Sequence, residues 1–287
     1  MGMQTVEITY RCEPGDVRAR PHPLSGEAAR LRLDEGNRAF ALLFHRSATE
    51  DDCVRHIIQV DPHDLGLSDG KSEVPLQRPF AAILACSDAR VPVELVFNEG
   101  PNDVFVARVA GNVLGAEVLG SLQYAVENLS GSVKLIAVVG HSGCGAVSTA
   151  VNVFLNPENY LPLAIKHSLR DILDRLLAVV QACAKRFART FGPDVIERPG
   201  YRKALVEAAV VTNAALTAYS IQKEFGAGDP VGLQSVYGVY LLETREVWSP
   251  VRGRGLDQPP ADQAGFIQLG DAIAKSERIA SLLELEG

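Results

Sequence analysis

The sequence predicts an α/β fold in which helices flank a central, mainly parallel β-sheet. Short, continuous apolar runs at residues 80–86, 104–109 and 133–140, with a fourth candidate at 232–242, are the first observation. Runs of this kind are typical of parallel strands that are buried on both faces. Helical stretches between these runs are the second observation, because strands that alternate with helices favour parallel pairing.

The helices follow the hydrophobic periodicity along the chain. An amphipathic pattern from residue 27 to about residue 48 predicts one or two N-terminal helices, weakly interrupted at Gly36. Further helices are predicted over 93–97, 116–129, 146–155, 169–191 and 201–225, and a terminal helix is predicted from about Asp271. The Pro/Gly-rich stretch 249–265 is expected to connect the last strand to that helix.

The length and composition indicate a globular protein. The chain has 287 residues, of which 47% are hydrophobic and 22% charged, and this excludes wholesale disorder. Residues 1–26 contain several prolines and no sustained periodicity, so we interpret them as an N-terminal arm or a poorly ordered lead-in. Residues 27–287 are assigned to a single α/β domain, with a turn-rich surface loop at 61–73.

The charge balance and the cysteines narrow the class of function. A net charge of −7 with scattered basic residues argues against binding to nucleic acid or to a membrane surface, and predicts a small-molecule partner. The apolar runs considered as strands are far shorter than the roughly 18 residues that span a bilayer. The five cysteines form an odd, sparse set, which argues against a disulfide framework and favours a cytoplasmic location.

Residues with reactive or metal-binding side chains follow two of the predicted strands. The first strand runs into Cys86, Asp88 and Arg90, and the third runs into His141 and Cys144. Because the carboxyl ends of neighbouring parallel strands form one crevice, these two groups are expected to converge across 55 positions of sequence.

Cys86, His141 and Cys144 make up a Cys₂His set of metal ligands. Three protein ligands leave the fourth tetrahedral position of zinc open, which favours catalysis over a structural role. The His-x-x-Cys turn precedes a predicted helix, whose N-terminus would favour the thiolate of Cys144. No other Cys or His adjoins these motifs, so Asp88 is the only nearby candidate for a fourth ligand.

Asp88 and Arg90 are predicted to act as a pair. A guanidinium two positions away can hold the carboxylate ionised and oriented. Asp88 could then accept a hydrogen bond from metal-bound hydroxide, or bind the metal itself and close the site. Taken singly, a cysteine here is usually a core residue, a histidine a loop residue and an Asp–Arg pair a surface ion pair. The five residues together, at the ends of two strands, favour a functional site. The chain has no Cys-x-x-Cys, which argues against a thiol redox protein.

The segment from Pro79 to Val147 resembles the β-class carbonic anhydrases. The resemblance is carried by CSDARVPVELVFNEGPNDVFVARVAGN, SLQYAVENL and VVGHSGCGAV, with weaker similarity in GNRAF and SVYGVYLLETREV. It implies one zinc ion per subunit, held by Cys86, His141 and Cys144, and an Asp88–Arg90 dyad. Four other residues match positions that line the CO₂ pocket, in the family often across a dimer interface: Gln77, Phe105, Ala110 and Tyr124.

The resemblance also implies an activity and an assembly. The activity is the zinc-dependent, reversible hydration of CO₂ to bicarbonate and a proton by zinc-bound hydroxide. The assembly is a homodimer or a dimer of dimers, with an N-terminal helical arm over the partner subunit. Two alternatives stay open, a related zinc hydrolase acting on CS₂ or COS and a catalytically idle zinc-binding homologue. The sequence departs from the family pattern at Ala89, in the 61–73 loop, at Gly131 and Ser132, and in the long tail from Ser249.

Overall fold

A central, mainly parallel sheet lies in the middle of the protein, as the sequence predicts. It has five strands, one more than the four apolar runs of the sequence indicate. The computed structural model describes residues 5–12, 21–43, 53–65, 74–165, 167–226 and 233–284. The strand order is β4-β3-β5-β6-β7, and every pairing is parallel except that of β6 with β7. The strands are β3 (Ala81–Ala85), β4 (Val104–Arg108), β5 (Leu135–His141), β6 (Gln234–Tyr240) and β7 (Val247–Trp248).

The register brings three strand ends together. Ala85, the last residue of β3, pairs with Arg108 of β4 on one side and with Val139 of β5 on the other. The chain segments that leave these strands therefore start side by side at the carboxyl edge of the sheet. This is the edge at which open α/β sheets bind ligands.

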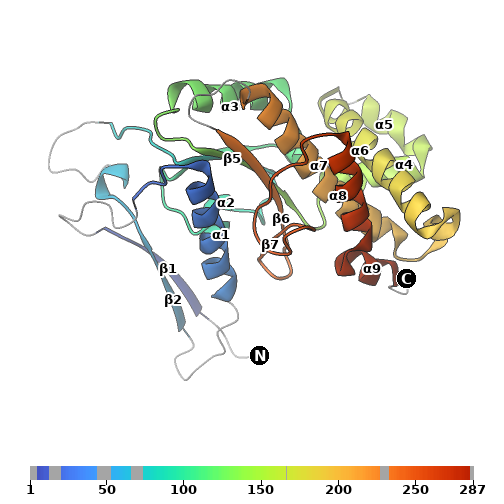
Figure 1. Cartoon of the computed structure of the whole chain (residues 1–287), viewed down its shortest axis with the longest axis horizontal. Coiled ribbons are helices and arrows are strands. Elements are labelled where there is room, and N and C mark those ends of the chain that lie inside the picture. The colour runs from blue at the N-terminus through green and yellow to red at the C-terminus, as the bar shows by residue number, and fades with distance from the viewer. Residues whose placement is uncertain are drawn as a thin grey trace.

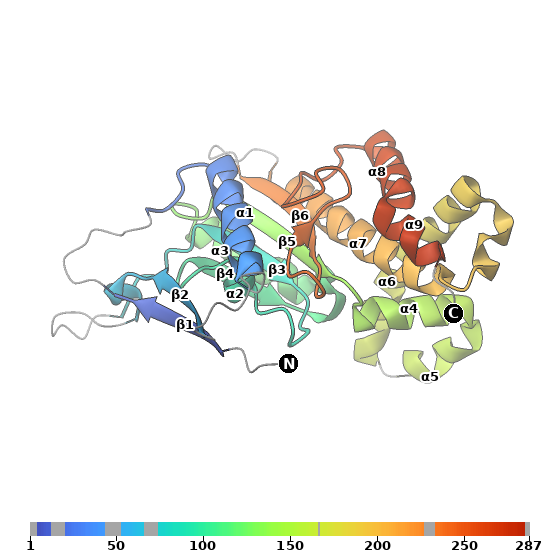
Figure 2. The ribbon, with the colours of Figure 1, turned by 90° about the horizontal axis from the view of Figure 1, so that it is seen from below.

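Helices cover both faces of the sheet (Figures 1 and 2). Alternate residues of β3 belong to different cores: Ala81, Ile83 and Ala85 to one, and Ala82 and Leu84 to the other. The first core is closed by α1 (Gly26–Leu42) and α2 (Val93–Val96). The second is closed by α3 (Ala116–Asn128), α4 (Gly145–Leu155), α6 (His167–Phe191) and α7 (Tyr201–Phe225), with the short α5 (Tyr160–Ala164) beside α6.

Helix α7 is the core helix of the second layer. Among the described helices it is the one with the length and hydropathy of a membrane span, yet 78% of its most apolar window is buried inside the protein. It packs against β5, β6 and α6, so its apolar surface is already used in the fold.

The first helix is continuous through Gly36, where the sequence predicted a weak interruption. Ser25 caps α1 by accepting a hydrogen bond from the Ala28 N–H. A Cβ atom at position 36 would lie 1.8 Å from the carbonyl oxygen of Phe97. Gly36 is therefore the point at which α1 packs closely against the end of α2, and it does not break the helix.

The C-terminal segment forms two helices where one was predicted from Asp271. Helix α8 (Gln263–Lys275) begins eight residues earlier, because Asp262 caps it by accepting from the Gly265 N–H. The extended backbone of Ser276 then separates α8 from α9 (Glu277–Glu284). Leu269, Ile273 and Ile279 join the core that α6 and α7 form.

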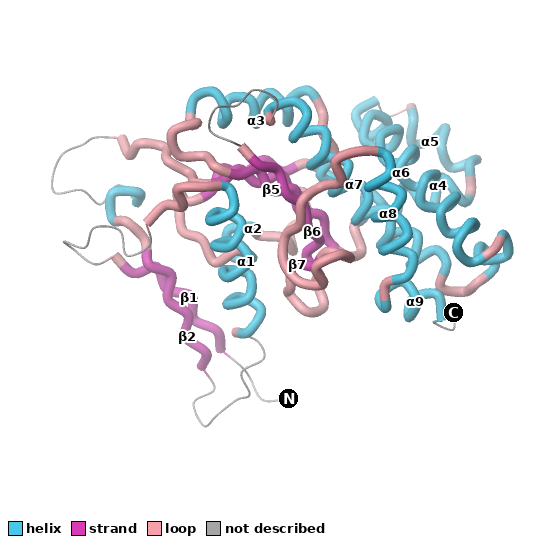
Figure 3. Tube along the Cα trace, viewed as in Figure 1, coloured by secondary structure: helices cyan, strands magenta, loops and turns pink. Residues whose placement is uncertain are grey.

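Two strands outside the main sheet were not predicted. Strand β1 (Thr5–Arg11), inside the expected N-terminal arm, pairs in parallel with β2 (Cys53–Gln59) and stands apart from the main sheet (Figure 3). The side chains of β1 are mostly exposed, so its sequence lacks the apolar run of a buried strand. The predicted 61–73 loop begins with a 3₁₀ turn, Pro62–Leu65, and its residues 66–73 lie outside the described part.

Candidate metal centre

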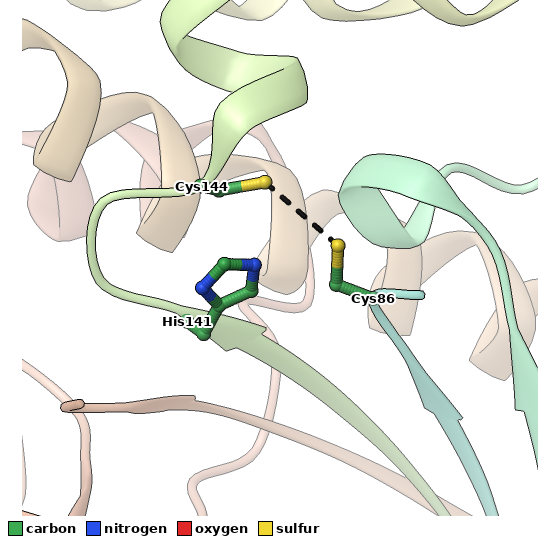
Figure 4. A group of neighbouring side chains, drawn as sticks. All are labelled: Cys86, His141 and Cys144. Atoms are coloured by element: carbon green, nitrogen blue, oxygen red, sulfur yellow. Dashed lines mark hydrogen bonds between the residues drawn. The ribbon is translucent and has the colours of Figure 1, made fainter. Parts of the chain in front are cut away.

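Three ligand side chains meet at the carboxyl edge of the sheet (Figure 4). Cys86 follows β3 directly, His141 is the last residue of β5, and Cys144 is the N-cap residue of α4. Their ligand atoms all lie within 4.8 Å of one another, and all three residues are buried. The structure thus brings together the three residues that the sequence predicted as ligands.

Two glycines shape the backbone around this cluster. Gly143, in the turn between His141 and Cys144, has φ +62°, a left-handed conformation that other residues rarely adopt. Gly111 has φ +66° and donates its N–H to the Sγ atom of Cys86 over 3.3 Å. The first glycine lets both ligands of the turn reach one point, and the second supplies a donor that stabilises a thiolate.

The cluster has the dimensions and the donor atoms that zinc requires. The Sγ atoms of Cys86 and Cys144 lie 4.0 Å apart. Two zinc–sulfur bonds of about 2.3 Å at a tetrahedral angle would place them about 3.8 Å apart. The Nδ1 atom of His141 lies 3.0 Å from the carbonyl oxygen of Ser142, which can only accept, so Nδ1 carries the proton. The buried Nε2 atom then has a free lone pair and no hydrogen-bond partner among the described residues.

The two thiols influence each other's ionisation. The pKa of Cys86 is lowered to about 4, first because Cys144 donates a hydrogen bond to its sulfur. The pKa of Cys144 is raised, first because that hydrogen bond favours its protonated form and then because of burial. The two thiols therefore share one hydrogen bond, which favours ionisation of Cys86 and opposes that of Cys144. A divalent cation would favour two thiolates, so the donor set fits a metal of charge +2.

Asp88 and Arg90 form a close ion pair beside the cluster. The Nε and Nη2 atoms of Arg90 donate to the two carboxylate oxygens of Asp88 over 2.9 and 2.7 Å, and the Arg90 backbone N–H donates over 2.9 Å. These hydrogen bonds hold the pKa of Asp88 well below its usual range, against a smaller effect of burial. The Oδ2 atom of Asp88 also lies 3.7 Å from Nε2 of His141. An ionised carboxylate therefore faces the ligand atoms.

The four predicted pocket residues are not together in one chain. Ala110 follows β4 and adjoins Gly111, next to Cys86. Phe105 pairs with Ala82 near the other end of the sheet, and its ring lies 6.5 Å from that of Tyr124, which is 50% exposed. Gln77 is exposed and precedes β3, whereas Cys86 follows it, so the strand of about 17 Å lies between them.

Two residues that contact the site were not predicted from the sequence. Arg108 donates from Nε to the carbonyl oxygen of Cys86 over 3.0 Å and also donates to the carbonyl oxygen of Asp88. Glu207, from α7, accepts from the Gly143 N–H over 2.8 Å. Arg108 could have been noticed because it ends a predicted strand at the same edge. The sequence around Glu207 carries no motif that indicates a role in the site, because its contact with Gly143 depends on how α7 packs against the turn.

The fold and this cluster define an α/β protein with a candidate Cys₂His site for a divalent metal. A family model described as carbonic anhydrase matches residues 81–239, more than half of the chain. The chain therefore belongs to the β-carbonic anhydrase family, and the resemblance inferred from the sequence motifs is confirmed.

Curated relatives agree with this assignment. Carbonic anhydrase 2 of Mycobacterium tuberculosis is 39% identical over 125 residues, which cover 42% of this chain and 53% of that protein. The carbonic anhydrase of Mycolicibacterium smegmatis is 40% identical over 111 residues, covering 39% and 50%. These matches span about half the length of the relatives. The Coccomyxa β-carbonic anhydrase structure, in complex with acetazolamide, is 23% identical with a TM-score of 0.44, covering 65% of this chain and 76% of that one.

Proposed function

We propose that the protein is a zinc-dependent carbonic anhydrase that hydrates CO₂ reversibly to bicarbonate and a proton. The observation that carries this proposal is the convergence of Cys86, His141 and Cys144 within 4.8 Å, beside the Asp88–Arg90 pair. Membership of the family supports it. We further propose that the protein acts in the cytoplasm, which suits the unpaired state of the described cysteines.

Cys86, His141 and Cys144 would hold the zinc ion through two sulfurs and one nitrogen. When bound with an open fourth position, zinc lowers the pKa of water enough to make a nucleophile available near neutral pH. Two thiolates would balance the charge of the ion. The hydrogen bond from His141 to the Ser142 carbonyl fixes the ring so that Nε2 points into the cluster.

Asp88 would orient the attacking water. Its carboxylate faces the ligand atoms of the cluster. The Oδ2 atom can therefore accept a hydrogen bond from the O–H of a water molecule at the metal centre. Arg90 has the complementary task, because its two side-chain hydrogen bonds keep Asp88 ionised and aimed at that point. Without the hydrogen bonds from Arg90, Asp88 would be free to bind zinc itself and close the site.

A second copy of the chain would complete the substrate pocket. Gln77 and Tyr124 are exposed in the single chain, and with Phe105 they lie away from the cluster. Apolar rings and an amide of this kind suit CO₂, which has no charge and no dipole. We therefore propose a dimer in which these three residues of one subunit approach the metal centre of its partner, next to Ala110.

Stopped-flow measurement of CO₂ hydration, together with metal analysis of the purified protein, tests the proposal. We expect one zinc ion per subunit and an activity that a chelator abolishes and zinc restores. Zinc without CO₂ hydration would contradict the proposal. In that case turnover of CS₂ or COS would indicate a related hydrolase, and no turnover would indicate an idle zinc-binding homologue.

A further inference from the structure

The turn between two of the metal ligands is anchored by two glutamates from distant parts of the chain. The Gly143 N–H donates to Oε1 of Glu207, on α7, over 2.8 Å. The Ser142 hydroxyl donates to Oε2 of Glu243, in the segment after β6, over 2.8 Å. The same hydroxyl accepts from the Leu242 N–H over 2.9 Å. Both residues of the turn that lie between His141 and Cys144 are therefore held by hydrogen bonds.

Arg278, on the C-terminal helix α9, joins the two glutamates. Its Nε and Nη2 atoms donate to Oε2 of Glu207 over 3.0 and 2.7 Å. Its Nη1 atom donates to Oε1 of Glu243 over 2.5 Å. One guanidinium thus binds a carboxylate on each side, and each carboxylate uses its other oxygen to hold the turn.

The ion pair between Glu207 and Arg278 is largely buried. The side chain of Glu207 is 10% exposed and that of Arg278 is 22% exposed, whereas Glu243 is 49% exposed. A buried carboxylate without its cation is costly, so loss of Arg278 would force Glu207 to move or to take up water. Either response would disturb the hydrogen bond that Glu207 accepts from Gly143.

We propose that Glu207 and Arg278 are positioning residues for the metal site, through which α9 sets the affinity for zinc. They touch neither the ligand atoms nor the candidate metal position. They act by fixing the backbone of the turn, so that Nε2 of His141 and Sγ of Cys144 stay at the spacing that one ion requires. This inference rests on the proposed zinc site. It also gives the long C-terminal tail a role in positioning the metal site. The sequence departs from the family pattern in this tail.

A second ion pair of the same tail offers a matched control. Asp271, on α8, accepts from Nη1 of Arg186, on α6, over 2.9 Å. This pair also docks the C-terminal segment on the helical layer, but the structure records no contact between it and the 141–144 turn. Asp271→Asn should therefore remove one docking contact of α8 and leave the contacts of Arg278 with Glu207 and Glu243 in place.

The test is a zinc affinity measurement by competition with a chromogenic chelator, on full-length protein. The wild type is compared with Arg278→Gln, Arg278→Lys, Glu207→Ala and Asp271→Asn. Outer residues that orient metal ligands typically contribute 10- to 100-fold to affinity. We expect roughly a 10-fold loss or more for Arg278→Gln and Glu207→Ala, a smaller loss for Arg278→Lys, and a change within about twofold for Asp271→Asn.

A spectroscopic measurement separates positioning from general destabilisation. Cobalt(II) loaded into the apoprotein absorbs through its thiolate bonds and reports the ligand geometry. We expect this absorption to change in Arg278→Gln and to be restored in part by Arg278→Lys, while Asp271→Asn keeps the wild-type spectrum. Circular dichroism and thermal unfolding would show which variants fold. If Arg278→Gln does not fold, the comparison of Arg278→Lys with Asp271→Asn decides.

The outcomes distinguish this inference from the proposed function. A wild-type protein that binds no zinc would overturn both. A wild type that binds zinc, with Arg278 and Glu207 variants that match Asp271→Asn in affinity and spectrum, would overturn the positioning role alone.

Discussion

The Sγ atoms of Cys86 and Cys144 lie 4.0 Å apart although 58 residues separate them in the chain. The parallel pairing of β3 with β5 produces this approach, because it aligns the ends of the two strands at one edge of the sheet. Cys86 leaves β3 at that edge, and a short turn after β5 returns Cys144 to it at the start of α4. The site is therefore a direct consequence of the sheet topology.

Replacement of Arg90 by alanine should lower the rate of CO₂ hydration while zinc content is retained. Arg90 touches Asp88 and none of the three ligands, so its loss frees the carboxylate without removing a metal bond. We expect a loss on the order of 10²-fold, the lower end of the range for a side chain that is positioned at the proton of a reacting group. Stopped-flow kinetics with metal analysis measures both quantities.

Arg254→Ala is the matched control for Arg90→Ala. Arg254 is also exposed and also ion-paired, to Glu246 over 3.2 Å. We expect it to leave the rate unchanged. Wild-type activity in Arg90→Ala would refute the role of the dyad.

A pocket shared between subunits predicts complementation between two inactive variants. Gln77→Ala should damage the site of the partner subunit, whereas Arg90→Ala should damage the site of its own subunit. A mixed dimer then contains one site with both residues intact. Random mixing of the two variants should restore about a quarter of the wild-type activity. If the mixture shows only the sum of the two variant activities, the pocket is not shared in this way.

The buried thiol of Cys183 predicts a loss of stability at alkaline pH. Burial raises the pKa of Cys183 to about 11, although the hydrogen bond with Thr212 lowers it somewhat. An unfolded thiol titrates near pH 8.5. Between these values the unfolded chain holds fewer protons than the folded protein, so the free energy of unfolding falls by about 1.4 kcal/mol per pH unit. Urea unfolding at pH 8 to 10 should show this fall.

Cys183→Ala should remove that part of the pH dependence. The other groups that titrate in this range are common to both proteins, so the difference between the two curves isolates the thiol. Parallel curves for the variant and the wild type would show that the folded protein does not suppress ionisation of Cys183.

Two glycine-to-alanine variants should change stability in opposite directions. A Cβ atom at Gly36 would meet the Phe97 carbonyl oxygen at 1.8 Å, so Gly36→Ala should displace α1 and destabilise the protein by about 3 kcal/mol. Gly120, inside α3, has no neighbouring atom within 4 Å of its would-be Cβ, so Gly120→Ala should stabilise by about 0.5–1 kcal/mol. Thermal or urea unfolding measures both. Equal effects would contradict the close packing at Gly36.

The sequence predicted the parts of the protein that depend on local pattern. The apolar runs located β3 to β6, and the residues after β3 and β5 then followed from the rule that parallel strand ends converge. Local chemistry was also readable where it was missed, since Asp262 carries the N-cap signal that starts α8. Strand β1 was different, because its exposed side chains carry no apolar signal.

Features that depend on tertiary or subunit packing could not be predicted in this way. The hydrogen bonds from Gly143 to Glu207 and onward to Arg278 join residues 64 and 71 positions apart. No spacing rule links them, because the contact depends on how α7 and α9 pack. The proposed role of Tyr124 could not be predicted either, because it depends on packing between subunits. Its ring is half exposed in one chain, so its proposed place in a pocket requires a second chain.

The most direct test of the central claim is X-ray absorption at the zinc edge of the purified protein. We predict two sulfur ligands at about 2.3 Å and one histidine nitrogen at about 2.0–2.1 Å, with a light atom in the fourth position. Cys144→Ser should lose one sulfur and much of the zinc, in a protein whose circular dichroism is unchanged. A wild-type spectrum with no sulfur ligands, or a Cys144→Ser variant with the wild-type zinc content, would contradict the assignment of the metal centre.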